Sequence, residues 1–397
     1  MEQHRRPAYR CVKWRRVVVP PAVAAAIRAA ERPTCVYVYD RGVLHRNVAA
    51  LRAALPAGTR VAYAMKANGD DRVLAALLPV VDGLEVASGG ELAAAVAAGS
   101  RFTLFSGPAK TDADLRAAVA AGAVLNVESL HELRRLTMYG PARVCLRVNR
   151  AHPALPGSHA MAGVATAFGI DERLLPDAVG LARAGGLDIA GFHLHAVSNN
   201  LDAAAHAAYI RDAVDWAGRA AQQWGVPAPI INVGGGFGVD IAGGGRFDLD
   251  TFAAALGDLV LPPGASLVVE PGRFVAATAG WYATEVLDVK RTHGRWFVVV
   301  RGGTHHFRLP ASWGYSHPFT VLPVDAWPYP FQRPQVSDAT VDVAGEQCNP
   351  RDVLARDAAV GLVRAGDVLV FAGTGAYGWE VAHHDFLRHA HPQFMVV

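Results

Sequence analysis

The chain has 397 residues, 52% of them hydrophobic and 18% charged, and it carries a formal net charge of +3. Its length exceeds one ordinary domain, and its composition is typical of a globular protein and excludes a disordered or fibrous chain. So small a charge argues against nucleic-acid binding, which requires a clustered positive excess. We therefore expect two globular domains and no nucleic-acid partner.

The start of the chain gives no sign of a membrane segment. The apolar stretch from Val17 to Ile27 is interrupted by Pro20-Pro21 and is too short to span a bilayer. Arg15-Arg16 precede it as in a twin-arginine signal, but no cleavage region follows, so we predict a cytoplasmic protein without a membrane partner. Four scattered cysteines form no C-x-x-C pair and suit a reducing compartment without structural zinc: Cys11, Cys35, Cys145 and Cys348.

From about residue 60 the sequence alternates short apolar runs with alanine-rich helical stretches. Eight apolar runs predict strands at Arg60–Met65, Gly83–Ala87, Phe102–Phe105, Val124–Asn126, Arg143–Asn149, Asp188–His193, Pro229–Val233 and Ser266–Val269. Helices are predicted between them at Gly90–Ala98, Asp112–Ala121, Ser129–Leu136, Leu174–Ala184 and Asp202–Gln222. Eight βα units are the number that closes a (β/α)8 barrel. We predict an α/β fold with a TIM barrel over residues 36–275.

After Pro271 the pattern changes to β-rich sequence punctuated by glycine and proline. Further strands are predicted at Tyr282–Lys290, Arg295–Val300, Val341–Ala344 and Asp367–Phe371. The apolar segment Cys11–Val19 is a candidate for one more strand of the same domain. We predict a second, mostly β domain formed by residues 1–35 and 276–397, and a surface loop at Gly243-Gly244-Gly245.

Lys66 follows the first predicted barrel strand directly. The chain has only four lysines, Lys13, Lys66, Lys110 and Lys290, and its other permanent cations are all arginine. Arginine supplies charge equally well, but only lysine can lose a proton and form a Schiff base. Taken alone, Lys66 favours the simpler interpretation of a lysine that reaches from a strand end into solvent.

The other strand ends carry polar groups as well, where a TIM barrel places its chemistry. They are Glu85 and Ser88, Asn126 and Glu128, Arg147 and Asn149, His193 and His195 with Ser198-Asn199-Asn200, Gly234–Gly238, and Glu270-Pro271-Gly272-Arg273. The glycine run is either a flexible turn or a nest of N–H groups for a phosphate, and its place after strand seven favours the nest. His195 is either a core histidine or a flat ring that stacks on a planar cofactor. A buried Glu270 needs a cationic partner, and a protonated pyridine nitrogen would serve.

Four histidines near the end of the chain resemble metal ligands at first sight: His383, His384, His389 and His391. They do not form a helical i, i+4 pair with a carboxylate in register, as zinc sites on helices do. We therefore predict contact with solvent or substrate and no metal.

Together these motifs resemble the fold-type III pyridoxal-phosphate decarboxylases, the ornithine and diaminopimelate decarboxylase family with its alanine racemase-like fold. The resemblance covers nearly the whole chain in the right order. It rests on Tyr63-Ala64-Met65-Lys66-Ala67-Asn68, Glu85-Val86-Ala87-Ser88-Gly89-Gly90-Glu91-Leu92, His193-Leu194-His195, Gly234-Gly235-Gly236-Phe237, Glu270-Pro271-Gly272-Arg273, Cys348 with Asp352, and Gly375-Ala376-Tyr377.

The resemblance implies a role for each residue. Lys66 would carry the Schiff base to pyridoxal 5'-phosphate, His195 would stack on its ring, and Glu270 would keep its pyridine nitrogen protonated. Cys348, presented by the partner subunit of a head-to-tail homodimer with shared active sites, would protonate the product carbanion. Other cofactor contacts would come from Glu85 and Arg147, and around the phosphate from Ser198, Gly235, Gly236, Gly272, Arg273 and Tyr377. The β-rich domain would contribute to the substrate site and the dimer interface.

Departures from the family pattern bear on the substrate. Asn349 follows Cys348, where ornithine and diaminopimelate decarboxylases carry an acid that suits a distal ammonium, although Asp352 could partly substitute. The segments after Gly303 and Tyr377 are rich in donors and resemble the branch that serves citrate-based siderophore synthesis, in which a citryl-diaminopropionate adduct loses CO2 to give citryl-ethylenediamine. Contacts to this carboxylate-rich substrate would come from His305, Arg308, Asp352, Tyr377 and His383.

Several alternatives stay open at this point. A diaminopimelate or ornithine-type decarboxylase shares the motifs named above, but it differs in the acid after the cysteine and in the sequence that follows Tyr377. An amino-acid racemase shares the fold and Lys66, but Glu270 and Cys348 oppose it. A non-catalytic pyridoxal-phosphate carrier lacks a β domain, and a cofactor-free barrel enzyme would leave Lys66 unmodified.

Overall fold

The computed structural model describes residues 18–151, 155–241, 245 and 247–397. They form two compact units, a barrel unit from residue 44 to 239 with 245–275, and a β-rich unit from residues 18–43, 240–241 and 276–397. Most of the segment Cys11–Val19, the pair Arg15-Arg16, and Gly243-Gly244 lie outside the described residues.

Eight parallel strands close the barrel. They are β2 (Arg60–Ala64), β3 (Gly83–Val86), β4 (Thr103–Phe105), β5 (Val124–Val127), β6 (Arg143–Asn149), β9 (Asp188–His193), β11 (Ile230–Asn232) and β12 (Ser266–Val269). Each pairs with the next, and β12 closes the circle by pairing with β2 through Val268 and Arg60. All eight were predicted, and the TIM barrel with a second, mostly β domain is confirmed.

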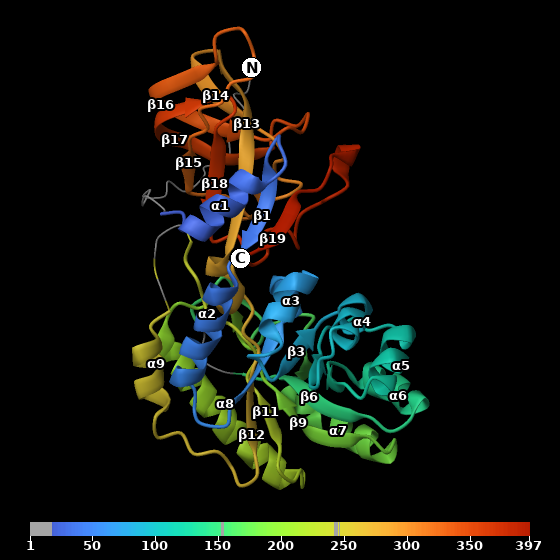
Figure 1. Cartoon of the computed structure of the whole chain (residues 1–397). Coiled ribbons are helices and arrows are strands. Elements are labelled where there is room, and N and C mark those ends of the chain that lie inside the picture. The colour runs from blue at the N-terminus through green and yellow to red at the C-terminus, as the bar shows by residue number, and fades with distance from the viewer. Residues whose placement is uncertain (1–17, 152–154, 242–244, 246) are drawn as a thin grey trace, which may run out of the picture. The chain divides into compact units, whose positions relative to one another are not determined.

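Helices surround these strands (Figure 1). They are α2 (Arg41–Ala54), α3 (Asp71–Leu77), α4 (Gly89–Ala97), α5 (Asp112–Ala120), α6 (Leu130–Leu136), α7 (Leu175–Ala184), α8 (Ala203–Gln223), α9 (Leu249–Leu256) and α10 (Arg273–Ala276). Several begin where a side-chain oxygen accepts a backbone N–H, as Ser88 does for α4 and Thr111 for α5. Each such cap stabilises its helix by about 1 kcal/mol. No helix within the described ranges is long and apolar enough to cross a membrane.

The barrel interior is filled by small and branched side chains, one from nearly every strand: Ala62, Leu104, Val124, Cys145, Ala190, Ile230 and Val268. Packing is close enough that a Cβ added to Gly191 would lie 2.0 Å from the carbonyl oxygen of Ile230. The polar strand ends therefore sit on a rigid, apolar base.

The β-rich unit is built on a sheet with the strand order β15-β18-β13-β14-β16-β17, in which β1 also pairs with β13, and β19 pairs with β1. The strands are β1 (Cys35–Tyr39), β13 (Gly280–Thr292), β14 (Arg295–Val300), β15 (Phe319–Leu322), β16 (Gln335–Ala344), β17 (Val353–Arg364), β18 (Val368–Ala372) and β19 (Gln393–Val396). Helix α1 (Pro21–Ala29) packs its buried face on this sheet through Val23 and Ile27.

The division between the units falls after residue 43, whereas the sequence suggested a boundary at residue 36. Strand β1 accounts for the difference. It pairs with β13, with Tyr37 opposite Tyr282, and so belongs to the β-rich unit although it precedes the first barrel strand.

Candidate active site

Lys66 lies in the 3-10 turn η1 (Met65–Ala67) that follows β2, and its ammonium forms an ion pair with Glu85 on the neighbouring strand β3. The Lys66 side chain is 44% exposed, whereas Glu85 is 1% exposed. The second carboxylate oxygen of Glu85 is buried and has no hydrogen-bond partner within the described part of the chain. Glu85 thus holds the lysine amine at the rim of the barrel and keeps one acceptor for a ligand.

Glu270 follows β12 and is 4% exposed. Its Oε1 accepts a hydrogen bond of 2.7 Å from Asn232 Nδ2, and His193 Nε2 lies 3.4 Å from its Oε2. Burial alone would raise the pKa of Glu270, but His193, the charge of Lys66 and the bond from Asn232 outweigh it and hold the pKa below its usual range. The barrel therefore holds a buried, ionised carboxylate, which is the partner that a cationic ring nitrogen needs.

His195 lies two residues beyond the end of β9 and is partly buried. Its Nδ1 accepts a hydrogen bond of 3.2 Å from the N–H of Gly235, so the proton of the neutral ring is on Nε2. Burial and the nearby charge of Arg147 lower the pKa of His195 well below its usual range. The imidazole ring is therefore held in one orientation and is neutral at pH 7. Both properties suit a ring that stacks on a planar cofactor.

The glycine loop Gly234–Gly238 is held in one conformation. Gly234 and Gly236 have φ of +70° and +99°, and Gly235 between them does not lie in this region. A Cβ on Gly235 would lie 2.4 Å from the carbonyl oxygen of Glu270, so no larger residue fits. The N–H groups of Gly234 and Gly235 donate to Asn232 Oδ1 over 2.9 Å and to His195 Nδ1 over 3.2 Å. The loop is therefore rigid rather than a flexible turn, and its role as a phosphate nest stays a prediction.

Other predicted phosphate residues lie in the barrel unit near this loop or near Lys66. Ser198 ends β10 (Val197–Ser198), is partly buried, and accepts a hydrogen bond of 2.8 Å from the N–H of Ser158 through its carbonyl. Gly272 packs on the turn that carries Lys66, since a Cβ on it would lie 2.8 Å from the Cβ of Ala67. Arg273 follows as the first residue of α10.

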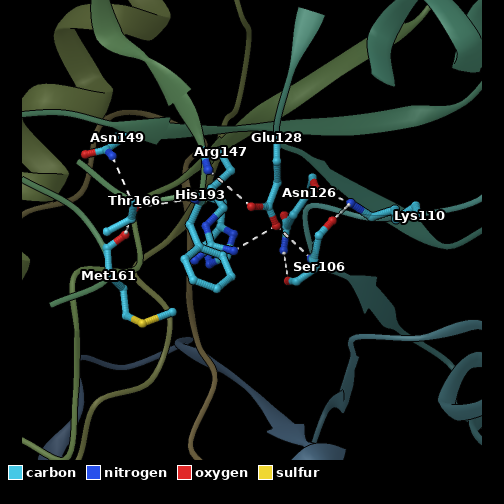
Figure 2. A network of polar contacts seen from close by, with 12 residues as sticks. Ser106, Lys110, Asn126, Glu128, Arg147, Asn149, Met161, Thr166 and His193 are labelled. Carbon is cyan, nitrogen blue, oxygen red and sulfur yellow. Dashed lines mark hydrogen bonds and ion pairs between the residues drawn. The ribbon is translucent and has the colours of Figure 1, made fainter. Parts of the chain in front are cut away.

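Arg147 on β6 is fixed by Glu128, which follows β5 (Figure 2). Glu128 Oε1 accepts bonds of 2.8 Å from Arg147 Nη1 and 2.7 Å from the N–H of Gly107, and its Oε2 accepts one from Gly169. The guanidinium also lies 4.8 Å from the ring centre of Phe168. Its Nη2 is buried without a hydrogen-bond partner among the residues described, so one donor of this cation is kept for a ligand.

Lys110, in contrast, is a structural cation of the same network (Figure 2). Its Nζ donates three bonds of 2.8 Å, to Glu132 Oε1 and to the carbonyl oxygens of Gly107 and Asn126. Its side chain is 1% exposed. Because all three ammonium donors are used, Lys110 has no capacity for chemistry, whereas Lys66 is accessible.

In the β-rich unit, the loop between β16 and β17 exposes Cys348. Cys35 and Cys145 are buried, and burial raises the pKa of each thiol to about 12. Asp352 is 2% exposed, and its carboxylate accepts bonds of 2.6 Å from the N–H of Thr304 and 2.9 Å from that of Gln347. These partners are backbone groups, so the geometry supports a role for Asp352 in fixing the loop that carries Cys348.

His305, Arg308 and His383 belong to one hydrogen-bonded network of the β-rich unit. Arg308 Nη1 donates to His383 Nδ1 over 2.9 Å, and Gln347 Nε2 donates to His305 Nδ1 over 2.8 Å. His383 Nε2 lies 3.4 Å from Gln347 Oε1 and completes the connection. Arg308 is exposed and His305 is fully buried, so the network extends from the surface into the interior, and one of its members, Gln347, directly precedes Cys348 in the sequence.

Tyr377 lies in the turn after β18 and is partly buried. Its φ is +58°, a left-handed conformation that a bulky residue adopts only where the surrounding structure enforces it. The turn is tightly packed at the next residue as well, because a Cβ on Gly378 would lie 2.4 Å from the carbonyl oxygen of Thr374.

Four residues with a clear place in these networks had no role in the sequence-based hypothesis: Glu128, His193, Asn232 and Gln347. Glu128 and His193 were visible as polar strand ends. Asn232 is a polar residue at the last position of an apolar buried strand, a signal that would have found it. Gln347 carries no such signal, because its partner His305 is distant in the sequence.

The strand ends of the closed barrel thus carry an accessible lysine, a buried carboxylate, a neutral imidazole and a rigid glycine loop. Residues 41–277 match the family model "Pyridoxal-dependent decarboxylase, pyridoxal binding domain". The chain belongs to this family, and its predicted nature as a carboxy-lyase with pyridoxal 5'-phosphate as cofactor is confirmed.

Relatives make the comparison more specific. The chain is 38% identical over 396 residues to the 2-[(L-alanin-3-ylcarbamoyl)methyl]-2-hydroxybutanedioate decarboxylase of Staphylococcus aureus, an alignment that covers 96% of this chain and 98% of the relative. It is 32% identical to the diaminopimelate decarboxylase of Deinococcus radiodurans, over 87% of this chain and 85% of the relative. The resemblance to fold-type III decarboxylases near the siderophore branch is thereby confirmed.

Solved structures agree on the fold. The crystal structure of diaminopimelate decarboxylase from Helicobacter pylori complexed with L-lysine superposes with a TM-score of 0.80 at 23% identity, and covers 94% of this chain and 93% of that chain. The AQ1208 protein of Aquifex aeolicus superposes with a TM-score of 0.79 at 26% identity, covering 94% of this chain and 88% of its own.

Proposed function

We propose that this decarboxylase acts on a citryl-diaminopropionate adduct and releases CO2 to leave citryl-ethylenediamine, a step in the synthesis of a citrate-based siderophore. The observation that carries the proposal is the network of Arg308, His383 and Gln347, the residue that precedes Cys348. The exposed guanidinium of Arg308 suits a substrate with several carboxylates. The S. aureus relative supports it, because its name describes an amino acid joined through an amide to a hydroxy-dicarboxylic acid.

Bound pyridoxal phosphate supplies an electron sink for the electron pair that remains when CO2 leaves. Lys66 would hold the cofactor covalently and Glu270 would pair with its ring nitrogen. A carboxylate that stays ionised keeps that nitrogen protonated, which strengthens the sink. His195 would cover one face of the ring. The glycine loop would hold the phosphate, together with Ser198, Gly272, Arg273 and Tyr377.

Glu85 and Arg147 would line the cofactor, and each has a buried polar atom without a hydrogen-bond partner in the described ranges, the first an acceptor and the second a donor. Such atoms are costly to bury unless a ligand satisfies them. These two orphan atoms are the structural reason to expect a polar ligand at the barrel rim.

Cys348 would donate the proton that replaces CO2 on the substrate carbon. We propose that it does so from the partner subunit of a head-to-tail homodimer, that the β-rich domain contributes to the substrate site and the interface, and that the enzyme is cytoplasmic. The exposed position of Cys348 on a loop fixed by Asp352 supports this role.

Shared sites can be tested by mixing two inactive variants, Lys66→Ala and Cys348→Ala. If each site combines Lys66 of one subunit with Cys348 of the other, a hybrid dimer contains one intact site. Random subunit exchange then restores about a quarter of the wild-type rate. Recovery of no activity from a demonstrated hybrid dimer would contradict the shared site.

Other substrates are less well supported. Both oxygens of Asp352 accept backbone hydrogen bonds, and Asn349 stands where related diamine-forming enzymes carry an acid. Neither residue then offers a distal ammonium a free carboxylate. A racemase is disfavoured because an ionised Glu270 supports electron withdrawal by the cofactor ring.

The substrate test supplies the citryl adduct, diaminopimelate, ornithine and lysine in separate reactions. We expect CO2 release to be fastest on the citryl adduct, with the citryl-ethylenediamine product identified by mass spectrometry. Faster turnover of any of the free amino acids would overturn the siderophore assignment. Loss of chirality without CO2 release would support a racemase instead.

A further inference from the structure

Gln347 lies at the centre of the hydrogen-bonded network of the β-rich unit. It follows β16, directly precedes Cys348 and is 7% exposed. Its Nε2 donates hydrogen bonds of 2.8 Å to His305 Nδ1 and 3.2 Å to Thr304 Oγ1, and its Oε1 faces His383 Nε2 over 3.4 Å. This one buried amide therefore uses both of its donors and its acceptor within the network.

Glu346 determines one end of this network. Its carboxylate accepts a hydrogen bond from Arg301, and its Oε1 lies 3.4 Å from His305 Nε2, a contact that is longer than an ordinary hydrogen bond and mainly electrostatic. Burial alone would raise the pKa of Glu346, but His305 and Arg301 outweigh it and hold the pKa below its usual range. An ionised carboxylate can only accept, so the proton of a neutral His305 ring lies on Nε2. His305 Nδ1 must then accept from Gln347.

Arg308 determines the other end. Its Nη1 lies 2.9 Å from His383 Nδ1. A guanidinium can only donate, so His383 accepts through Nδ1 and carries the proton of the neutral ring on Nε2, which faces Gln347. Burial and the charge of Arg308 lower the pKa of His383, so this ring is neutral at pH 7. The Nε2–H group of His383 therefore requires the oxygen of Gln347 as its acceptor.

The amide of Gln347 fits in only one of its two orientations. If it were turned over, its oxygen would face the lone pair of His305 Nδ1 and its NH2 group would face the Nε2–H group of His383. Both contacts would be repulsive. The observed orientation instead forms a chain of side chains in which every hydrogen points the same way, and we call it the donor chain: Arg308, His383, Gln347, His305 and Glu346.

A side chain in the middle of the donor chain must accept on one side and donate on the other, which a carboxylate or an apolar side chain cannot do. We propose that Gln347 is a positioning residue that sets the direction of the donor chain and so holds the exposed guanidinium of Arg308 with its remaining donors free for the carboxylates of the substrate. A guanidinium held in this way loses less conformational entropy when the substrate binds. This inference rests on the function proposed above, because Arg308 is the group expected to bind those carboxylates.

A double-mutant cycle with the holoenzyme and the citryl adduct tests the proposal. In Gln347→Leu the His383 ring loses its acceptor and Arg308 loses its fixed orientation, so we expect KM to rise about fivefold. The backbone bond of 2.9 Å to Asp352 remains, so kcat should stay within about twofold of the wild-type value. Because Gln347 acts through Arg308, the same substitution in an Arg308→Ala background should leave KM unchanged. An equal rise of KM in both backgrounds, an unchanged KM in Gln347→Leu, or a fall in kcat alone would overturn the proposal.

Gln393→Leu is the matched control. Gln393 lies in the same unit and is partly buried, and its amide donates to the backbone oxygen of Glu31 over 3.3 Å, outside the donor chain. We expect its KM and kcat to equal those of the wild type. A rise of KM in Gln393→Leu as large as in Gln347→Leu would show a general loss of packing and overturn the specific role of Gln347.

A second readout needs no substrate and tests the donor chain itself. Nitrogen-15 NMR of the wild-type holoenzyme with labelled histidine should show His305 and His383 as the Nε2–H tautomer at neutral pH. Their signals are assigned as those missing from His305→Ala and His383→Ala. An Nδ1–H tautomer of either ring would overturn the proposal even if Gln347→Leu fails to fold. Faster wild-type turnover of a free amino acid would instead overturn the proposed function, and with it the binding role of Gln347, whatever the tautomers.

Discussion

The barrel unit and the β-rich unit build their polar sites in different ways. In the barrel, Lys66, Glu85, Arg147 and Glu270 come from the ends of parallel strands, which topology brings to one rim. In the β-rich unit, His305, Gln347 and His383 come from loops and meet through hydrogen bonds between distant segments. We therefore expect the chemistry that the family shares to reside in the part fixed by topology, and substrate choice to reside in the part that loops determine.

The largest effect is expected when the buried carboxylate of the barrel, Glu270, is replaced. In Glu270→Gln the side chain keeps its shape and loses its charge, so it no longer holds a ring nitrogen protonated. We expect kcat to fall by about 100- to 1000-fold while the cofactor stays bound. Steady-state kinetics together with the visible spectrum of the variant measure both effects. A nearly unchanged kcat would show that Glu270 is not the group that keeps the ring nitrogen protonated.

Asp352→Asn tests whether the β-rich unit depends on one carboxylate for its loop geometry. An amide donor would face the N–H of Thr304 or Gln347, and one buried bond would be lost. We expect the free energy of unfolding to fall by about 1–3 kcal/mol. Urea denaturation measures it, with the exposed Asp338→Asn as the matched control. Equal stability in both variants would remove the positioning role of Asp352.

Arg308→Ala tests whether the β-rich unit determines substrate choice. Loss of an exposed cation from a carboxylate-binding network should raise KM for the citryl adduct about tenfold, with little change in kcat. Arg291→Ala, at an exposed position on β13, should leave both constants unchanged. If kcat falls and KM does not, Arg308 acts in the chemical step.

The smallest effect concerns the hydrogen bond from Asn232 to Glu270. The pKa of Glu270 is held below its usual range, so its contribution to stability is present above that range and lost as pH falls through the folded-state pKa. Asn232→Ala removes one of the interactions that lower the pKa of Glu270. The loss of stability on acidification should therefore begin at a higher pH. We expect a cost of about 1 kcal/mol near neutral pH. Urea unfolding from about pH 7 down to about pH 2 measures both, and an identical pH profile would exclude the role of Asn232.

Most of the barrel could be predicted from the sequence, because its strands are buried on both faces and therefore consist of continuous apolar residues. Five helices were predicted to within one residue at each end, and α2, α3, α9 and α10 were not named. Lys66 and Glu270 could be placed because strand ends of a parallel barrel meet at one rim. The close packing of Gly235 and Gly238 against other backbone segments could not be read, because it depends on contacts with Glu270 and Asn200.

The β-rich unit was only partly predictable. Its strands β1, β15, β17 and β19 were not named, although β13, β14, β16 and β18 were. Strand β1 depends on pairing with β13, which is distant in the sequence, and the central Asp357 of β17 interrupts its apolar alternation. The partners of His305 and Asp352 follow from the same long-range pairing, so local patterns contain no information about them.

The central claim is a covalent bond between Lys66 and the cofactor aldehyde. Borohydride reduction of the holoenzyme followed by peptide mapping measures it directly. We predict a pyridoxyl mass on the peptide that contains Lys66, none on that peptide in Lys66→Ala, and no turnover by that variant. A label on another lysine such as Lys110 or Lys290, or a Lys66→Ala variant that still releases CO2, would contradict the account.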